Sequence, residues 1–424
     1  MKKYTLPFQI NIHEPDLKNS FKNRFEIKEY CSGCMTENDR KHLIQKVIDI
    51  CHASGGGTVI VNEGKWISGP LKLYDNICLS LQENAEILFS QEPEDYLPVV
   101  FTRWEGIECY NYSPLIYANG CKNIAITGKG KLNGMGQSWW NWKKKQKDAA
   151  EELCYAESNG ISVDKRIYGT REAALRPSFI QFIHCRDIFL YDFSIEEGPQ
   201  WTIHPVYCEN VIIKRVKVRT TGHNTDGLNP DSCKNVWIEG CSFSTGDDCI
   251  AINSGMNEDG WRVGRPCENV VITDCDMNGG HGAVVIGSGM SGGVKNIYAS
   301  NCRVDGTMQG IRIKSMRGRG GYIKDIWFED MFVYNISNAA IQISMFYPYS
   351  TVMPKDNLPP QISDIKIKNI FGNHNHTAIE IRGLEEAGIR NIEMENIVMS
   401  AGKSIITENV ESILLQNVNI SNEY

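Results

Sequence analysis

The sequence predicts an all-β solenoid, in which short strands stack into successive coils. The first observation is a repeated phrase in which Asn or Asp precedes alternating apolar residues, as in C-K-N-I-A-I-T from Cys121 and C-E-N-V-V-I-T from Cys267. The alternation predicts a half-buried strand, and Asn or Asp predicts a turn at its start. The second observation is the period, because this turn residue recurs every 21 to 39 residues from Asp187 to Ser412. A β-sandwich with similar strands is the alternative.

The N-terminal end of such a solenoid needs a cap, because a terminal coil exposes apolar core. Thr36 and the acidic residues after it predict the start of a helix. Leu43, Val47, Ile48 and Cys51 fall on one face of that helix. We therefore expect a capping helix over residues 36–53 at one end of a single domain that spans residues 1–424.

Residues 141–175 interrupt the repeats. This stretch is rich in Lys, Glu and Ala and lies between two predicted strands. An insertion of this size in a solenoid forms a loop or helix over one face, often the binding face. A solvated surface excursion is the alternative. Its cations are Lys143, Lys144, Lys145, Lys147, Lys165, Arg166 and Arg171.

Composition excludes several kinds of partner. A net charge of −7 argues against a nucleic acid held by global electrostatics. No run of about 18 apolar residues is present, so no membrane span is predicted. The N-terminus lacks the apolar segment of a signal peptide, so we expect a cytoplasmic protein. An exported protein whose signal peptide has been removed is the alternative, and the sequence does not predict the oligomeric state.

The 15 cysteines are scattered along the chain, and several begin or end apolar runs. We expect reduced core thiols rather than a disulfide framework. Cys31 and Cys34 form one C-x-x-C motif, but a structural zinc site needs a second such pair and none is present. We therefore expect no metal and no cofactor.

Four polar motifs fall on successive predicted coils. Neighbouring coils lie ~4.8 Å apart, so motifs on the same strand of each coil form a patch roughly 15 Å long. Asp247 and Asp248 are adjacent, and both can face outward only if a turn or bulge intervenes, which Gly246 permits. Asp226 then comes within one or two coils of both. The motifs are N-T-D-G from Asn224, G-D-D from Gly246, G-H-G from Gly280 and R-I-K from Arg312.

Crowded carboxylates predict acid–base chemistry. Because they cannot all ionise easily, the pKa of one rises, which gives the protonated acid and ionised base that glycoside hydrolysis needs. Three aspartates are also a hard-cation site, so calcium is the competing interpretation. Arg312 and Lys314 would oppose a bound metal and suit a substrate carboxylate better. His281 can orient the acid or bind sugar.

In this order and at these separations, the four motifs resemble glycoside hydrolase family 28, the polygalacturonase family. The resemblance implies a right-handed single-stranded parallel β-helix. Its bacterial branch includes exo-polygalacturonases that remove galacturonic acid from non-reducing ends. Short segments that resemble sequences of this branch occur along nearly the whole chain. They begin at Gly55, Ser68, Thr102, Asn111, Leu175 and Val285.

The resemblance also implies roles for individual residues. Asp247 would be the general acid, Asp226 and Asp248 would activate water for inversion, and His281 would support the acid. The expected substrate-binding residues are Arg312, Lys314, Tyr347, Asn224, Asn253 and Arg103. At the position of Asn253, exo-acting bacterial members more often carry Lys.

We therefore expect an inverting hydrolase that releases galacturonic acid from polygalacturonate or oligogalacturonides. We expect the 141–175 insertion to close the cleft beyond the terminal sugar. The alternatives within the family are rhamnogalacturonan and xylogalacturonan hydrolases. Outside it, a calcium-dependent β-helical polysaccharide lyase and a non-catalytic carbohydrate-binding protein remain.

Overall fold

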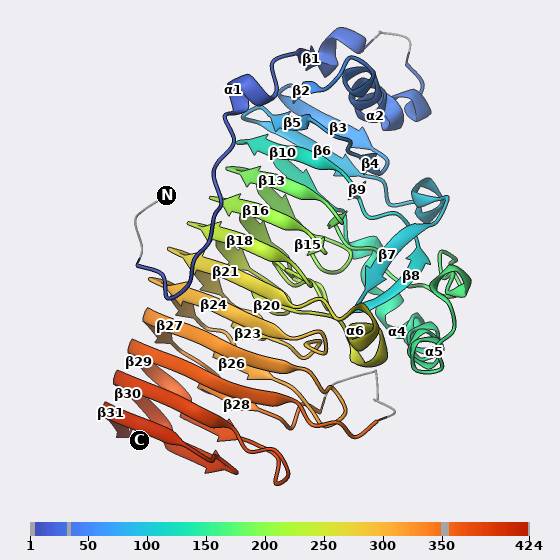
Figure 1. The fold of residues 1–424 in the computed structure, drawn as a ribbon. Coiled ribbons are helices and arrows are strands. Elements are labelled where there is room, and N and C mark those ends of the chain that lie inside the picture. Colours follow the sequence, from blue (N-terminus) through green and yellow to red (C-terminus); the bar gives the residue numbers. More distant parts are fainter. Residues whose placement is uncertain (1–4, 32–34, 349–355, 423–424) are drawn as a thin grey trace.

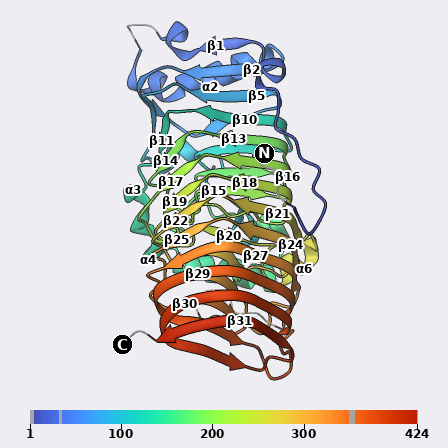
Figure 2. The ribbon, with the colours of Figure 1, turned by 90° about the vertical axis from the view of Figure 1, so that its left-hand side faces the viewer.

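The chain forms a right-handed parallel β-helix, which is the predicted fold class (Figures 1 and 2). The computed structural model describes residues 5–31, 35–348 and 356–422. Its coils are built from three rows of parallel strands, here called the first, second and third rows. The end of the N-terminus and part of the C-x-x-C motif, residues 32–34, lie outside the described residues.

The first row carries the repeated Asn or Asp phrase. Its last strands are long and continue round the corner into the other rows. In order it contains β1 (Arg24–Glu26), β2 (Gly57–Val61), β5 (Ile77–Leu81), β10 (Lys122–Gly128), β13 (Arg186–Tyr191), β16 (Glu209–Lys214), β18 (Lys234–Glu239), β21 (Cys267–Thr273), β24 (Val294–Ser300), β27 (Tyr322–Tyr334), β29 (Gln361–Arg382), β30 (Arg390–Glu408) and β31 (Ile413–Asn422).

The second and third rows complete each coil. The second row contains β3 (Gly64–Ser68), β6 (Ala85–Phe89), β11 (Lys131–Asn133), β14 (Ser194–Glu196), β17 (Lys217–Arg219), β19 (Ser242–Ser244), β22 (Asp276–Asn278) and β25 (Arg303–Asp305). The third row contains β4 (Leu71–Lys72), β9 (Ile116–Asn119), β12 (Ile180–Ile183), β15 (Ile203–Val206), β20 (Ile250–Ile252), β23 (Gly282–Ile286), β26 (Gln309–Lys314) and β28 (Ala339–Ser344).

The turn residues of the repeated phrase stack into a ladder. Asn210, Asn235 and Asn269 have φ values of 57°, 56° and 58°, in the left-handed region that Asn tolerates better than most residues. Each donates its side-chain amide to the residue one coil earlier, Asn210 to Asp187 at 3.0 Å and Asn235 to Asn210 at 3.1 Å. The phrase recurs because each coil needs the same backbone turn and the same side-chain hydrogen bond.

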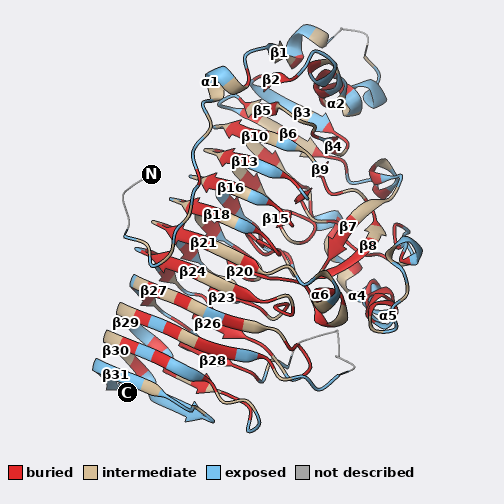
Figure 3. Cartoon of the chain, viewed as in Figure 1, coloured by how far each residue is buried: buried red, intermediate tan, exposed pale blue. Residues whose placement is uncertain are grey.

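The core fills the interior of the coils, and α2 (Glu37–Ala53) lies over its N-terminal end (Figure 3). Thr36 and Asp39 form a capping box at the start of this helix. Its apolar face, which includes Leu43, Val47 and Cys51, is buried in the core. Residues 36–53 therefore occupy the end of the solenoid and replace the coil that would otherwise cover it. Two short 3-10 helices, η1 (Ile27–Tyr30) and η2 (Pro93–Tyr96), lie in the same part of the chain.

Three excursions gather on the side of the third row (Figure 1). The first is an antiparallel hairpin, β7 (Val100–Trp104) and β8 (Ile107–Asn111). The second is the insertion, which forms α4 (Trp142–Lys145), α5 (Lys147–Ser158) and η3 (Val163–Lys165) just after α3 (Gln137–Trp140). The third is α6 (Asn257–Val263), and both β8 and α5 pack against it. The insertion is therefore attached to the third row through the hairpin and α6.

On the opposite side, the N-terminal segment, residues 5–21, runs across the outside of the first row (Figure 1). It ends in α1 (Leu17–Ser20). Within the described residues, no helix is long and apolar enough to span a membrane. Every cysteine that the structure describes is a free thiol.

Candidate active site

The first three polar motifs lie at or just before the start of third-row strands, whereas R-I-K forms the end of β26. Leu228 bridges Ile250 of β20, which pairs in register with β23, and β23 pairs in register with β26. The carboxylates of the first two motifs and the cations of the fourth are therefore held within a short run of successive coils. The sequence predicted this stacking from motif order alone, and the strand register accounts for it.

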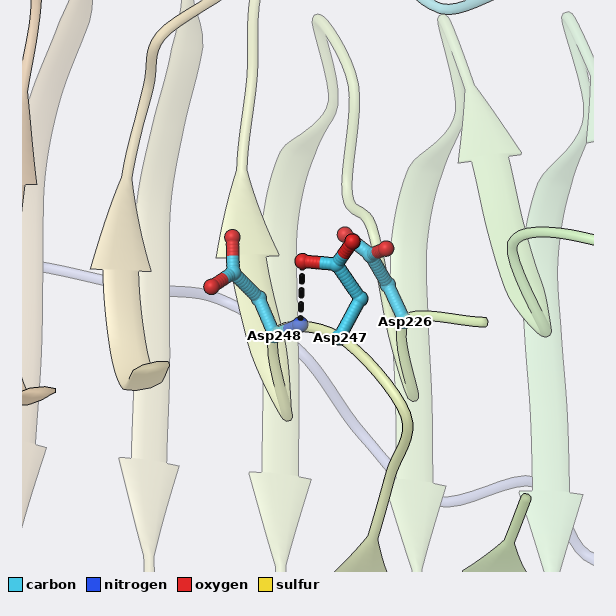
Figure 4. Close-up of side chains that lie close together, drawn as sticks. All are labelled: Asp226, Asp247 and Asp248. Carbon is cyan, nitrogen blue, oxygen red and sulfur yellow. Dashed lines mark hydrogen bonds between the residues drawn. The ribbon is translucent and has the colours of Figure 1, made fainter. Parts of the chain in front are cut away.

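A turn allows both neighbouring aspartates to face the same cleft. Asp247 lies in the loop before β20, where its carbonyl oxygen accepts a hydrogen bond from the Thr245 hydroxyl at 2.7 Å. Its side chain folds back and accepts from the backbone N–H of Asp248 at 3.0 Å (Figure 4). The Gly246 position admits only glycine, because a Cβ there would lie 2.1 Å from the Gly222 carbonyl oxygen.

Asp226, Asp247 and Asp248 form one carboxylate cluster (Figure 4). Each offers an oxygen, and these oxygens lie within 4.8 Å of one another. Asp226 accepts a hydrogen bond from Asn229 at 2.8 Å, and Asp248 pairs with Lys314 at 2.7 Å. Asp226 and Asp248 are buried. The cluster therefore concentrates negative charge where little water can screen it.

The three carboxylates do not share the proton equally. Burial, together with the charges of Asp247 and Asp248, raises the pKa of Asp226 well above its usual range. Burial by itself would raise the pKa of Asp247, but the hydrogen bond from His281 and the charges of His281 and Lys314 outweigh it and lower that pKa. In the free protein these shifts favour a proton on Asp226 over one on Asp247.

His281 accompanies Asp247 at the surface of the cleft. Its Nδ1 lies 3.0 Å from Asp247 Oδ1, and its side chain is 50% exposed. The hydrogen bond to Asp247 raises the pKa of His281. The pair therefore holds one proton close to Asp247 and in contact with solvent.

The cleft has two lobes that share Lys143, Asn224, Asp247, Lys314 and Tyr347. The N-terminal lobe has a volume of 120 Å³ and the C-terminal lobe 560 Å³. The other residues that line the N-terminal lobe include Glu105, Gly106, Trp201, Asp226, Asp248, Asn253, Met256 and Ser288. Those of the C-terminal lobe include His281, Arg312, Gln342, Phe346, Glu380 and Arg382.

The predicted substrate-binding residues Arg312, Lys314 and Tyr347 converge where the lobes meet. The Lys314 ammonium lies 5.0 Å from the centre of the Tyr347 ring, and the Arg312 guanidinium 5.7 Å. Arg312 donates from Nε to Gln342 at 3.1 Å. Lys314 already pairs with Asp248, so it neutralises the carboxylate cluster as well as facing the cleft.

Asn224 and Asn253 also line the cleft. Asn224 belongs to both lobes, and its side-chain oxygen accepts from Arg176 at 2.8 Å. Arg176 also donates to Gln146 of the insertion at 2.9 Å, which links the insertion to the loop of Asp226. Asn253 lies in the N-terminal lobe and donates to the Ala251 carbonyl at 3.1 Å.

Arg103 is the exception among the predicted substrate-binding residues. Its side chain has no solvent exposure and pairs with the equally buried Asp231 at 3.0 Å. It also donates to the Gly106 carbonyl at 3.1 Å and lines neither lobe. The prediction that Arg103 binds substrate is therefore wrong, because a fully buried guanidinium already has its charge paired inside the protein. It anchors the β7–β8 turn instead.

Glu105 and Trp201 were not predicted from the sequence, and Lys143 was predicted only as part of a basic cluster. All three line the N-terminal lobe. A partial signal for Glu105 was present, since a two-residue step ending in Gly separates two strand-like segments, although Asn or Asp is the usual residue before that Gly. No local pattern places Trp201 or Lys143 in the cleft, because each arrives through contacts between distant segments.

Crowded carboxylates with unequal pKa values face an elongated cleft on a β-helix. This combination defines a class of protein, the β-helical enzymes that cleave carbohydrates. Residues 102–417 match the family described as "Glycosyl hydrolases family 28", and the chain belongs to that family. It is a family 28 glycoside hydrolase, as the motifs predicted.

Individual relatives agree with this assignment. The chain is 28% identical over 356 residues to a "Probable polygalacturonase" of Vitis vinifera, covering 82% of this chain and 67% of the relative. It spans 61% and 65% of two Arabidopsis thaliana relatives, and so about two thirds of the length of such curated relatives.

Among solved structures, a hyperthermoactive exopolygalacturonase from Thermotoga maritima has a TM-score of 0.88 and 34% identity, covering 97% of this chain and 94% of that one. A family 28 exopolygalacturonase from Yersinia enterocolitica has a TM-score of 0.71 and 21% identity, covering 95% of this chain and 79% of that one, and shows the same fold. The similarity to the Thermotoga structure therefore extends over almost the whole of both chains.

Proposed function

We propose that this protein is an exo-acting hydrolase that removes galacturonic acid from the non-reducing end of polygalacturonate or oligogalacturonides. The observation that carries the proposal is the shape of the cleft. The N-terminal lobe is bounded by the β7–β8 turn and by Lys143 of the insertion, whereas the C-terminal lobe continues along later coils to Glu380 and Arg382. The similarity to the Thermotoga exopolygalacturonase supports the same mode of action.

The uronic acid substrate follows from the charges in the cleft. Arg312 and Lys314 lie on one strand, β26, beside the carboxylate cluster. A guanidinium offers a planar pair of donors to a carboxylate, and the Lys314 ammonium adds a second positive charge. Lys314 already pairs with Asp248, but a neutral polysaccharide would leave the charge of Arg312 in the cleft without a ligand of opposite sign.

In the proposed reaction, Asp247 protonates the oxygen of the leaving sugar. Its proton comes from Asp226 of the same carboxylate cluster, because substrate binding excludes water from Asp247 and so favours its neutral form. This transfer leaves Asp226 ionised. Asp226 and Asp248 then hold the attacking water, and Asp226 accepts its proton as Asp247 gives its own to the leaving oxygen, which restores the starting protonation.

We propose inversion at the anomeric carbon. A water hydrogen-bonded to both Asp226 and Asp248 needs acceptors about 5 Å apart, given ~2.7 Å for each bond. The cluster oxygens lie within 4.8 Å, which fits one such water. This spacing is close to the ~5–5.5 Å of retaining enzymes and below the ~6.5–9.5 Å of most inverting ones, so product stereochemistry is a direct test. Proton NMR at early times should show the β-anomer of galacturonic acid.

A calcium-dependent lyase is disfavoured by one contact. The Lys314 ammonium lies 2.7 Å from Asp248, where it occupies the place that a cation would take at the cluster. We therefore expect hydrolysis to persist in chelator and no unsaturated product to form. Activity that disappears with EDTA and returns with calcium would favour the lyase.

The experiment that tests exo action is a time course on polygalacturonate. Monomeric galacturonic acid should be the product from the earliest time points, with little loss of viscosity, because the β7–β8 turn and Lys143 bound the N-terminal lobe. Short oligomers and a rapid fall in viscosity would show internal cleavage. Chromatography and viscometry on the same samples distinguish exo cleavage from internal cleavage.

We also propose a cytoplasmic location. The described cysteines are free, and several donate to backbone carbonyls of the preceding coil, such as Cys208 to Phe182 and Cys233 to Pro205, both at 3.1 Å. Such thiols suit a reducing compartment. Cell fractionation with an antibody tests this, and recovery from the medium would contradict it.

A further inference from the structure

One carboxylate in the N-terminal lobe has no part in the proposed reaction. Glu105 occupies the two-residue turn between β7 and β8, with φ values of 44° at Glu105 and 90° at Gly106. Such a turn, with positive φ at both residues, projects from the hairpin in a fixed direction. It places Glu105 in the same lobe as Asp226 and Asp247.

Buried contacts of Arg103 and a hydrogen bond from Gln200 fix the position of this turn. Arg103 joins the Gly106 carbonyl at 3.1 Å to Asp231 of the third row at 3.0 Å, and both charged side chains are fully buried. Gln200 donates to the carboxylate of Glu105 at 2.9 Å. The carboxylate is therefore held in place before any ligand binds, as a recognition group requires.

The carboxylate keeps capacity for a ligand. None of the ion pairs among the described residues includes Glu105, and the side chain is only half-buried. Burial and the charge of Asp247 raise the pKa of Glu105, while Lys143 and Arg176 oppose that rise. A carboxyl group in this position can accept a hydrogen bond from a sugar hydroxyl, but it repels a second uronate carboxylate.

We propose that Glu105 recognises the non-reducing end of the substrate by accepting a hydrogen bond from the free 4-hydroxyl of the terminal galacturonic acid. A chain that continued past this sugar would have no hydroxyl there and would bring another carboxylate toward Glu105. Lys143, which also lines the lobe, supplies the positive charge for the carboxylate of the terminal sugar. Glu105 is thus a specificity-determining residue, and this inference rests on the proposed exo action.

A purely structural role for Glu105 makes a different prediction. If it only ordered the hairpin through Gln200, its loss would slow the reaction equally on every substrate. If it reads the 4-hydroxyl, its loss changes the ratio of kcat/KM between substrates with and without that hydroxyl.

The test uses trigalacturonate and the same trisaccharide methylated on the 4-oxygen of its non-reducing sugar. The parent protein should prefer the free hydroxyl by about tenfold or more, because a charge-assisted hydrogen bond is lost on methylation. Glu105→Ala should lower kcat/KM on trigalacturonate and bring the ratio close to one. Glu105→Gln keeps an acceptor oxygen in the same shape and should give an intermediate ratio. Glu83→Gln changes an exposed carboxylate and is the matched control, with no expected effect.

The possible outcomes separate the two proposals. If the parent releases no galacturonic acid from trigalacturonate, the proposed function fails. If the parent is active but cleaves both trisaccharides equally, or if the ratio is unchanged in Glu105→Ala, the inference alone is overturned. If Glu105→Ala does not fold by circular dichroism, the ratio in Glu105→Gln decides, and a ratio equal to that of the parent rejects recognition through the charge of Glu105.

Discussion

The outer surfaces of the third and first rows belong to the same coils but carry opposite chemistry. On the third row, outward positions hold the charged groups of the cleft, such as Asp248 and Lys314, which pair at 2.7 Å. On the first row, the in-register outward positions of successive coils hold an apolar column that includes Phe189, Ile212 and Trp237. Because outward side chains do not fill the core, their chemistry can differ from row to row. The same coils therefore carry a polar cleft on one face and a buried apolar column on another.

The apolar column is covered by the N-terminal segment. Leu6, Phe8, Ile10 and Ile12 alternate with exposed residues and pack against the column, as an extended segment with period two allows. Phe8 contacts Trp327 with ring centres 5.9 Å apart. Each outward column of the stacked coils therefore needs either a function or a cover. Substitutions on the cleft face should affect catalysis, and substitutions on the covered face should affect stability.

The largest effect is expected on the cleft face. Asp247→Asn should lower kcat by at least ~10²-fold, the usual scale of general-acid catalysis, because the leaving oxygen loses its proton donor. The melting temperature should stay near that of the parent, since the substitution conserves volume. Steady-state kinetics and thermal melts on the same preparations check this.

The matched control for that variant is Asp276→Asn on β22, an exposed carboxylate outside the cleft. It should leave kcat unchanged. Near-normal turnover of Asp247→Asn would remove Asp247 from the role of acid and favour Asp226, whose pKa is raised.

A smaller effect on the cleft face concerns substrate charge. Arg312→Ala should lower kcat/KM on oligogalacturonides by about tenfold or more, because a bound carboxylate loses a charge-assisted hydrogen bond. The loss should shrink on methyl-esterified oligomers. Arg303→Ala, whose side chain is 61% exposed, is the control. An equal loss on free and esterified substrates would contradict recognition of the carboxylate.

The N-terminal segment should show the reverse pattern. Ile12→Ala removes a buried side chain from the cover of the first row and should lower the free energy of unfolding by about 2 kcal/mol. Values of kcat and KM should not change, because the cleft lies on the other side of the coils. Denaturant unfolding and kinetics measured together test this, and a fall in kcat without loss of stability would break the separation of the two faces.

The smallest effect is a pH dependence at the His281–Asp247 pair. The pKa of His281 is raised, so its contribution to stability is present at low pH and is lost as pH rises through that raised value. The pKa of Asp247 is lowered, so its contribution is lost only as pH falls through that lowered value. His281→Asn should therefore lower the melting temperature slightly between these two limits and not above the upper one. A difference that persists at alkaline pH would show that the imidazole contributes by packing instead.

Much of the site could be predicted because its signals are local. Each polar motif lies in a third-row strand or directly before one, and the repeating coil brings such positions together. Asp226, Asp247, Asp248, His281, Arg312 and Lys314 therefore converge as expected. Arg103 was misplaced because its partner Asp231 lies 128 residues away, and no local pattern distinguishes a buried arginine from one in a cleft.

The sequence by itself determined the coil, its repeated turn, the helix over the N-terminal end and the set of charged motifs. These depend on alternation, turn chemistry and spacing, which are properties of short segments. Only the tertiary structure decided which carboxyl has a raised pKa, that Lys314 pairs with Asp248, and that Glu105 lines the N-terminal lobe. Those features depend on burial and on distances between segments far apart in the chain, and both arise only once the coils, the hairpin and the insertion have packed together.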